Sequence, residues 1–392
     1  MSPKQLMQPV LIGIVTALVG FSSSFAVVLR GLSAVGANEA EAASGLMAGA
    51  IAMGLAGIVL SLALRQPVSA AWSTPGAALM AATGPVAGGW PGAVGAFLLT
   101  SALLILAALI KPFGRAVGRI PATLASAMLA GVLFGLCLAP VRAFSVAPGE
   151  TAVVVVVWLV ASRWRRLYAT PAAALAAAVI IALHAPAFDA ASIAPAPIWT
   201  TPKASLAAFV GLSLPLFIVT MASQNLTGIA VLRTYGYNPA PSTLIGVTGM
   251  FGALAAPFGC HAVNLSAITA ALCASSDADP DPKRRWIASA TCGAVYVGLG
   301  ATAGAATRLA AAAPALIEAV AGLALLGALG GSLAGALAEP QEREAAVVTF
   351  LVAASGASFY GVGGAFWGLL AGGLMLAVNS AGVWPRPPAP PS

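Results

Sequence analysis

The chain has 392 residues, of which 60% are hydrophobic and only 7% are charged. A soluble domain carries about 25% charged residues, so this composition indicates an integral membrane protein with little mass outside the bilayer. The formal net charge of +7 does not indicate nucleic-acid binding, because the basic residues lie between apolar segments, where they orient a chain in the membrane.

Apolar segments follow one another from the N-terminus, separated by short polar connectors. A helix needs roughly twenty residues to cross the hydrocarbon core, so each long segment is a candidate span. The first is predicted to be an uncleaved helix and not a signal peptide, since its apolar run continues to Leu29. The predicted elements are residues 9–29, 44–64, 67–83, 89–110, 121–140, 148–161 and 170–184, then a proline-rich connector at 185–204, then 206–232, 241–256, 259–273, 286–307, 314–337, 345–359 and 362–380.

These elements form an all-α membrane protein with seven elements in each half, at residues 1–184 and 205–392. An odd number per half inserts the second half upside down relative to the first, which is the inverted-repeat plan of many transporters. With the N-terminus inside, fourteen Lys and Arg residues fall on the cytoplasmic side and four on the other, so both termini are predicted to be cytoplasmic. The cytoplasmic residues are Lys4, Arg65, Lys111, Arg115, Arg119, Arg163, Arg165, Arg166, Arg233, Lys283, Arg284, Arg285, Arg343 and Arg386, and the others are Arg30, Arg142, Lys203 and Arg308.

The third element, residues 67–83, is too short to be a complete span. Ser73 or Thr74 is suited to cap a helix, and Pro75 is suited to its first position. The sequence therefore predicts a short helix that runs only to about Thr83.

The tenth element has the same pattern. Its helix is predicted to begin after Pro257 and Gly259, which leaves about fourteen residues before the polar run at Ser275. Two half-helices are therefore expected to begin inside the bilayer. Their unpaired N–H groups and the positive ends of their dipoles favour an anionic or polar ligand there.

The eighth element is the most polar one expected at membrane depth. Its Gln224 and Asn225 need partners, because an unpaired amide in hydrocarbon costs several kcal/mol. Ser223, Gln224 and Thr227 share one helix face and are expected to look toward the broken elements. Hydrogen bonding to a neighbouring helix, without a ligand, is the alternative.

Aromatic side chains in the first element are candidates for the wall of a pocket. Phe21 and Phe25 flank three serines, an arrangement suited to a flat ligand. Ordinary helix packing is the alternative reading.

His261 is one of only two histidines. At the start of the tenth element's half-helix, an imidazole is suited to bond a carboxylate or to take up a proton, with a structural role as the alternative. Asn264, three residues on, shares its face. Glu318 is the only acid inside an apolar run; a solvated place near the interface is favoured over a role as proton carrier.

Motifs for enzymatic chemistry are missing from the sequence. There is no P-loop, zinc-protease motif or nucleophile elbow, so neither ATP-driven transport nor an intramembrane enzyme is expected. The four cysteines lie in apolar runs without metal-ligand spacing, so no metal or cofactor is expected.

Three segments, ASQNLTGIAVLR (222–233), APFGCHAVNLSAITAA (256–271) and DPKRR (281–285), resemble the bacterial benzoate/proton symporter family (BenE). Residues 348–352 and 365–369 fit the same pattern. The resemblance implies a uracil-permease-type fold of seven plus seven inverted repeats, with a core domain of elements 1–4 and 8–11 and a gate domain of elements 5–7 and 12–14. It also implies that the third and tenth elements are half-helices, each preceded by a short extended strand.

One departure bears on the substrate. Nucleobase permeases of this fold carry acidic residues in the eighth and tenth elements, where this chain has Gln224 with Asn225 and His261 with Asn264. Amides, imidazole and helix N-termini suit a carboxylate ligand better than a neutral base.

The expected function is import of benzoate or a related aromatic carboxylate with a proton, by alternating access across the bacterial inner membrane. The alternatives are a nucleobase or inorganic-anion transporter of the same fold, or a channel-like or non-transporting membrane protein. A homodimer is possible within the wider fold. The expected substrate-binding residues are Ser73, Thr74, Gly76, Gln224, Asn225, His261, Ala262 and Asn264, with Phe21, Phe25 and Trp72 lining the ring. The candidates for proton coupling are His261 and Glu318.

Overall fold

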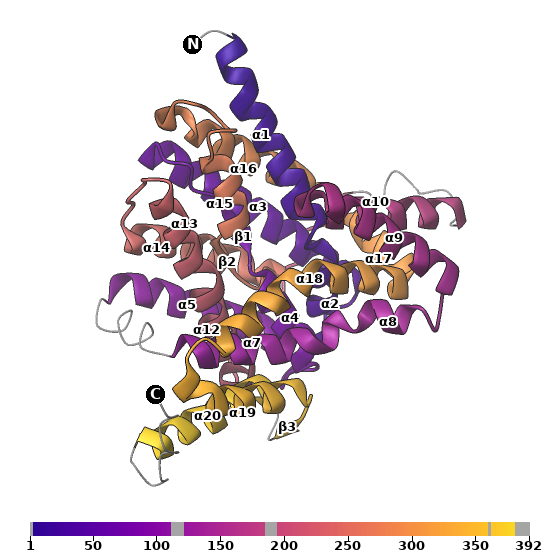
Figure 1. Cartoon of the computed structure of the whole chain (residues 1–392), viewed down its shortest axis with the longest axis vertical. Coiled ribbons are helices and arrows are strands. Elements are labelled where there is room, and N and C mark those ends of the chain that lie inside the picture. Colours follow the sequence, from indigo (N-terminus) through magenta and orange to yellow (C-terminus); the bar gives the residue numbers. More distant parts are fainter. Residues whose placement is uncertain (1–2, 111–120, 185–193, 360–361, 381–392) are drawn as a thin grey trace, which may run out of the picture.

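A computed structural model describes residues 3–110, 121–184, 194–359 and 362–380 of the chain (Figure 1). The predictions that concern Lys111, Arg115, Arg119 and Arg386, and the first part of the connector, lie outside these residues. Seven helices in the described ranges are long and apolar enough to cross a membrane, and a bent pair adds an eighth. The chain is therefore a multi-pass, mostly helical membrane protein.

Helices of the first half alternate with short turns. They are α1 (Pro3–Ser22), α2 (Phe25–Ala34), α3 (Glu39–Leu64), α4 (Thr74–Thr83), α5 (Gly89–Leu109), α7 (Ala122–Cys137), α8 (Ala139–Ala143), α9 (Pro148–Trp164) and α10 (Arg166–His184).

The second half contains two π-helical segments within one long span. Its helices are α11 (Leu206–Ala208), π-helix η2 (Phe209–Ser213), α12 (Leu214–Val219), π-helix η3 (Thr220–Asn225), α13 (Leu226–Thr234), α14 (Pro241–Ala255), η4 (Ala256–Phe258), α15 (Ala267–Ala274), η5 (Pro282–Arg284), α16 (Trp286–Gly300), α17 (Ala303–Ala312), α18 (Pro314–Ala336), η6 (Pro340–Glu342), α19 (Arg343–Ala354) and α20 (Gly364–Ser380).

Two spans predicted as single helices are interrupted. The first breaks between α1 and α2, where Ser23 and Ser24 donate to the Gly20 carbonyl over 3.1 and 2.8 Å, a local bond that competes with the helix ladder and bends helices. The eleventh, predicted over 286–307, bends by 59° between α16 and α17. Apolar composition gave no sign of either break.

Two antiparallel strands lie near the middle of the molecule, with α15 on one side of them and α4 on the other (Figure 1). Strand β1 (Ala70–Trp72) precedes α4 and strand β2 (Val263–Leu265) precedes α15. Ala70 pairs with Leu265, Ala71 with Asn264 and Trp72 with Val263. A second, peripheral pair joins β3 (Ser358–Phe359) to β4 (Val362–Gly363).

The start of α15 corrects the sequence prediction. The helix begins at Ala267 and not directly after Gly259, so it has only eight residues. Gly259 takes a left-handed conformation with φ +95°, which turns the chain and suits glycine. The following residues pair with β1 instead of coiling, and Ser266 then caps the helix.

The connector, where it is described, lies along the helices. Ile198 N donates to Ser44 Oγ over 2.9 Å, and Thr200 N donates to Pro257 O over 2.8 Å. Trp90 Nε1 donates to Thr200 Oγ1 over 3.0 Å. The segment between the two halves is thus attached to helices of both.

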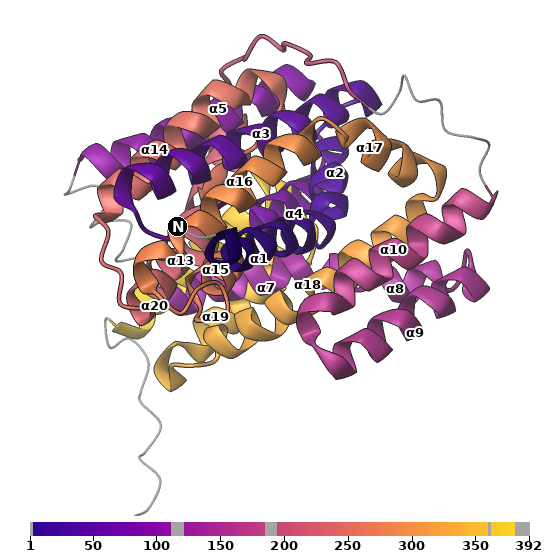
Figure 2. The same ribbon diagram turned by 90° about the horizontal axis from the view of Figure 1, so that it is seen from above.

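Glycines bring the central helices into close contact. A Cβ added to Gly54 of α3 would lie 2.5 Å from Gly293 O of α16, and one added to Gly293 would lie 2.5 Å from Gly54 O. Seen from above, α3, α5, α14 and α16 lie together, while α8, α9 and α10 lie apart from them (Figure 2). Without a hydrophobic force between helices in lipid, such close packing holds the spans together.

The replacement Gly293→Ala is expected to lower the free energy of unfolding by about 1–3 kcal/mol, because the new methyl group collides with the α3 backbone. Thermal unfolding of the detergent-solubilised protein measures the effect as a lower Tm. Gly298→Ala in the same helix is the control, since its Cβ meets no atom within 4 Å. Equal Tm values for the two variants would contradict this packing.

Candidate functional site

Serine residues cap the two half-helices at opposite ends of the strand pair. Ser73 Oγ accepts from Gly76 N over 3.1 Å at the start of α4, and Ser266 Oγ accepts from Thr269 N over 3.4 Å at the start of α15. Ser73 is one of the two caps that the sequence offered, and Thr74 is the first residue of the helix. Ser266 was not anticipated, although a serine three residues before a threonine in an apolar run is an N-cap signal.

The hydrogen bonds around the two caps repeat each other. Ser73 N donates to Ala262 O over 3.3 Å, and Ser266 N donates to Ser69 O over 3.0 Å. Each helix therefore begins beside the start of the opposite strand. In the described part of the chain no hydrogen bond reaches the N–H of Thr74 or Ala267, so these groups remain available to a ligand.

His261 lies beside α4, not at the start of its own half-helix as the sequence suggested. The residue is 2% exposed, and its Nε2 is 2.9 Å from Ser73 O. Because a carbonyl oxygen only accepts, Nε2 carries the proton in this contact. Phe97 packs edge-on at 6.4 Å between ring centroids. His261 thus holds the backbone of the α4 cap.

Asn225 and Asn264 also bind backbone. Asn225 Oδ1 accepts from Leu265 N over 3.0 Å, on the outer edge of β2. With its amide oriented to suit its neighbours, Asn264 places Nδ2 3.1 Å from Ala71 O and Oδ1 3.2 Å from Ser73 N. Both side chains are fully buried. They stabilise the strand pair, whose backbone would otherwise be unpaired in the membrane.

Gln224 and Thr74 are the polar side chains of the predicted set that remain free. Both are partly exposed, and neither side chain has a hydrogen-bond partner among the described residues. Thr220 Oγ1 donates to Ser73 Oγ over 3.0 Å, which joins η3 to the start of α4. Gln224 follows Thr220 by about one turn of the π-helix, so the two lie on the same side. Segments of π-helix occur frequently at functional sites.

The three aromatic residues of the predicted set lie in contact with one another and are buried. Phe21 lies 6.0 Å from Phe25 and 5.3 Å from Trp72 between ring centroids. Trp72 Nε1 donates to Ser24 Oγ over 2.8 Å, so the break in the first span fixes the indole. The sequence did not single out this role of Ser24.

Gly76, Ala262 and Glu318 complete the predicted set. A Cβ on Gly76 would lie 2.4 Å from Leu216 Cδ1 and 2.7 Å from Ser73 Oγ, so a side chain there would disturb the cap. Ala262 is buried and contributes its carbonyl to Ser73. Glu318 is not part of this cluster, because it pairs with Arg30 at 3.1 Å.

Together these residues place neutral hydrogen-bond donors beside an aromatic wall. The free donors are helix N–H groups, a hydroxyl and an amide, and the cluster formed by Thr74, Gln224, His261 and Asn264 contains no acidic side chain. Such an environment favours a negatively charged or strongly polar group over a cation.

The architecture is similar to that of a solved structure, the transmembrane domain of the bicarbonate transporter BicA from a cyanobacterium. The TM-score is 0.59 with 16% sequence identity, over 94% of this chain and 97% of the other. The two chains therefore share a multi-span membrane fold.

Sequence comparison then gives the family. The model for "Benzoate membrane transport protein" (BenE) matches residues 4–378, and the chain belongs to this family of membrane transporters, which are not enzymes. It is 41% identical over 376 residues to the inner membrane protein YdcO of Escherichia coli, covering 94% of this chain and 95% of the relative. It is 30% identical over 369 residues to the benzoate membrane transport protein of Acinetobacter baylyi, covering 92% of each.

The variant Asn225→Ala is expected to lose about 1–3 kcal/mol of stability, because Leu265 N is left buried without an acceptor. A lower Tm in detergent is the expected observation. Gln224→Ala in the same π-helix is the matched control and should change stability by less than about 0.5 kcal/mol. A stable Asn225→Ala protein would show that the amide does not hold β2.

Proposed function

We propose that the protein imports benzoate or a closely related aromatic carboxylate together with a proton, as a secondary transporter of the bacterial inner membrane. The observation that carries the proposal is the strand pair with a capped half-helix starting at each end. Helix N-termini inside a membrane suit the carboxylate of a substrate. In this proposal the carboxylate binds near Thr74 at the start of α4, and Gln224 orients it.

The aromatic cluster supports a ring on the substrate. Phe21, Phe25 and Trp72 come from α1, α2 and β1 and form a buried aromatic cluster next to the start of α4. A benzoate ring packs on such a cluster through area burial and ring–ring contact. Inorganic anions would gain nothing from this wall, and nucleobases would lack the acidic partners that their N–H groups need.

We propose further that the described segments form fourteen elements in two inverted repeats. An inverted repeat requires equivalent elements of the two halves to make equivalent contacts, and the structure has such pairs. Element 2 (α3) packs on element 11 (α16), and element 9 (α14) packs on element 4 (α5). Likewise α4 packs on α2, and α15 packs on α13. Together with the repeated cap bonds, these pairs support a twofold relation through the strand pair.

The same helix contacts divide the helices into two groups, which we propose to be two moving domains. Helices α7 to α10 pack mainly with one another and with α18 to α20, and the remaining helices pack around the strand pair. We assign the first group to a gate domain and the second to a core domain. Motion of the core against the gate would expose the substrate alternately to the two sides.

Proton coupling is assigned to His261 or Glu318. His261 holds the backbone at the cap of α4, so a change in its charge would act directly on the proposed substrate site. Glu318 joins α18 to α2 through Arg30, so its protonation would act on the contact between the proposed domains. With the positive-inside orientation, both termini face the cytoplasm.

Reconstituted protein is expected to take up labelled benzoate into proteoliposomes saturably, and an inward proton gradient should increase the rate. Excess unlabelled benzoate should compete, whereas uracil and sulfate should not. Equal uptake rates with and without the proton gradient would refute symport. Competition by uracil or sulfate would favour the corresponding alternative substrate, and non-saturable flux would indicate a channel.

The replacement Gln224→Ala is expected to weaken benzoate binding by about ten-fold or more, the effect of losing one hydrogen bond to a charged group. Binding to the detergent-solubilised protein measures this without transport. Thr234→Ala is the matched control, because Thr234 ends the same span and bonds its own helix at Ala230 O over 3.0 Å. Unchanged affinity in Gln224→Ala would remove this residue from the site.

A further inference from the structure

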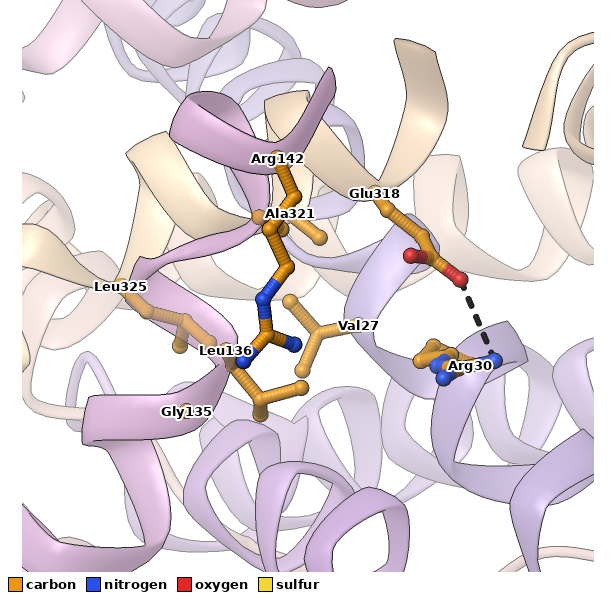
Figure 3. Close-up of a pocket in the computed structure, with 9 residues that line it drawn as sticks. Val27, Arg30, Gly135, Leu136, Arg142, Glu318, Ala321 and Leu325 are labelled. Atoms are coloured by element: carbon orange, nitrogen blue, oxygen red, sulfur yellow. Dashed lines mark ion pairs between the residues drawn. The ribbon is translucent and has the colours of Figure 1, made fainter. Parts of the chain in front are cut away.

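A pocket separate from the strand pair opens between α2, α7, α8 and α18 (Figure 3). Its cavity volume is about 50 Å³ and it opens to solvent, so a small group such as a carboxylate fits inside while the rest of a ligand lies in the opening. Arg30, Arg142 and Glu318 line it, and its apolar wall includes Val27, Leu136 and Leu325.

The charges in the pocket do not balance. Arg30 Nη1 lies 3.1 Å from Glu318 Oε1, whereas Arg142 forms no ion pair with any described residue. Figure 3 shows the Arg142 guanidinium pointing into the space beside Val27 and Leu136. Two positive groups and one negative group leave one positive charge without a partner.

A guanidinium next to apolar side chains is suited to a particular ligand. Its planar N–H groups bind a carboxylate through two parallel hydrogen bonds. Leu136 and Ala139, which line the pocket and are partly exposed, would pack against an apolar group attached to that carboxylate. A free inorganic anion would bind only the guanidinium, and a neutral aromatic molecule would contact only the apolar side chains.

We propose that this pocket is a second binding site, specific for apolar carboxylates, in which the ligand binds Arg142 and competes with Glu318 for Arg30. The side chains of Arg30 and Glu318 are 49% and 39% exposed. Exposed ion pairs are weak, so a ligand carboxylate can replace that of Glu318.

The place of the pocket gives the site a role. In the proposed division, α2 belongs to the core domain, and α7, α8 and α18 belong to the gate domain. In the proposed orientation, Arg30 and Arg142 lie on the side opposite the cytoplasm. The choice of benzoate as ligand rests on the proposed function. The pocket then collects the substrate anion at the entrance, before it reaches the strand pair.

Titration of the full-length, detergent-solubilised protein with ¹³C-carboxylate benzoate tests the site by NMR. The protein carries Gln224→Ala to weaken the proposed central site. Adding Arg142→Ala is expected to raise the Kd about three- to ten-fold, and adding Glu318→Gln is expected to lower it by a similar factor because Arg30 is released. Arg308→Ala, an exposed arginine of α17 outside the pocket, should leave the Kd unchanged.

Opposite signs for the two pocket variants distinguish a ligand site from a general disturbance of the packing around the pocket, which would weaken binding in both. Benzamide, which lacks the charge, should not compete, and added salt should weaken binding even without the substitutions. Equal Kd values across the variants, or binding insensitive to salt, would overturn the proposal. This binding is measured without transport. The test of the pocket therefore remains valid even if proton-driven uptake is not observed.

Discussion

Hydrogen bonding of extended backbone inside the membrane is the constraint on which the rest of the structure depends. Strands β1 and β2 are three residues long and satisfy only each other's inner edges. No water is available in a bilayer to satisfy the remainder. The outer edge of β2 therefore bonds Asn225, Trp72 N of β1 approaches Met53 Sδ at 3.2 Å, and serine hydroxyls cap both helices.

This constraint divides the polar residues into two groups. Asn225, Asn264 and His261 bind backbone, and their loss would disturb the strand pair first. Gln224 and Thr74 have no such duty within the described chain, so they are free to bind a substrate. A scaffold made of uncharged groups leaves the partial positive charge of the helix starts unopposed. That is the physical basis for expecting an anion at this place.

The two proposed sites differ in how they attract an anion. The pocket of Arg30 and Arg142 uses full charges in an exposed position, where water and salt weaken them. The strand pair uses partial charges in a buried position, where each hydrogen bond is stronger. In the proposed pocket, Glu318 would keep an anion from binding too tightly, since its carboxylate competes for Arg30. Weak capture followed by more specific binding suits a transporter that must also release its substrate.

Local signals in the sequence determined the membrane class, the family resemblance and a helix start at Ser73 or Thr74, because composition, motifs and capping preferences are properties of neighbouring residues. The tertiary structure decided the rest. It placed the start of α15 at Ala267, because pairing with β1, almost two hundred residues away, outweighs local helix preference. It also assigned Asn225 and His261 to the scaffold and brought Arg142 next to Arg30, since partners distant in the chain meet only when the helices pack.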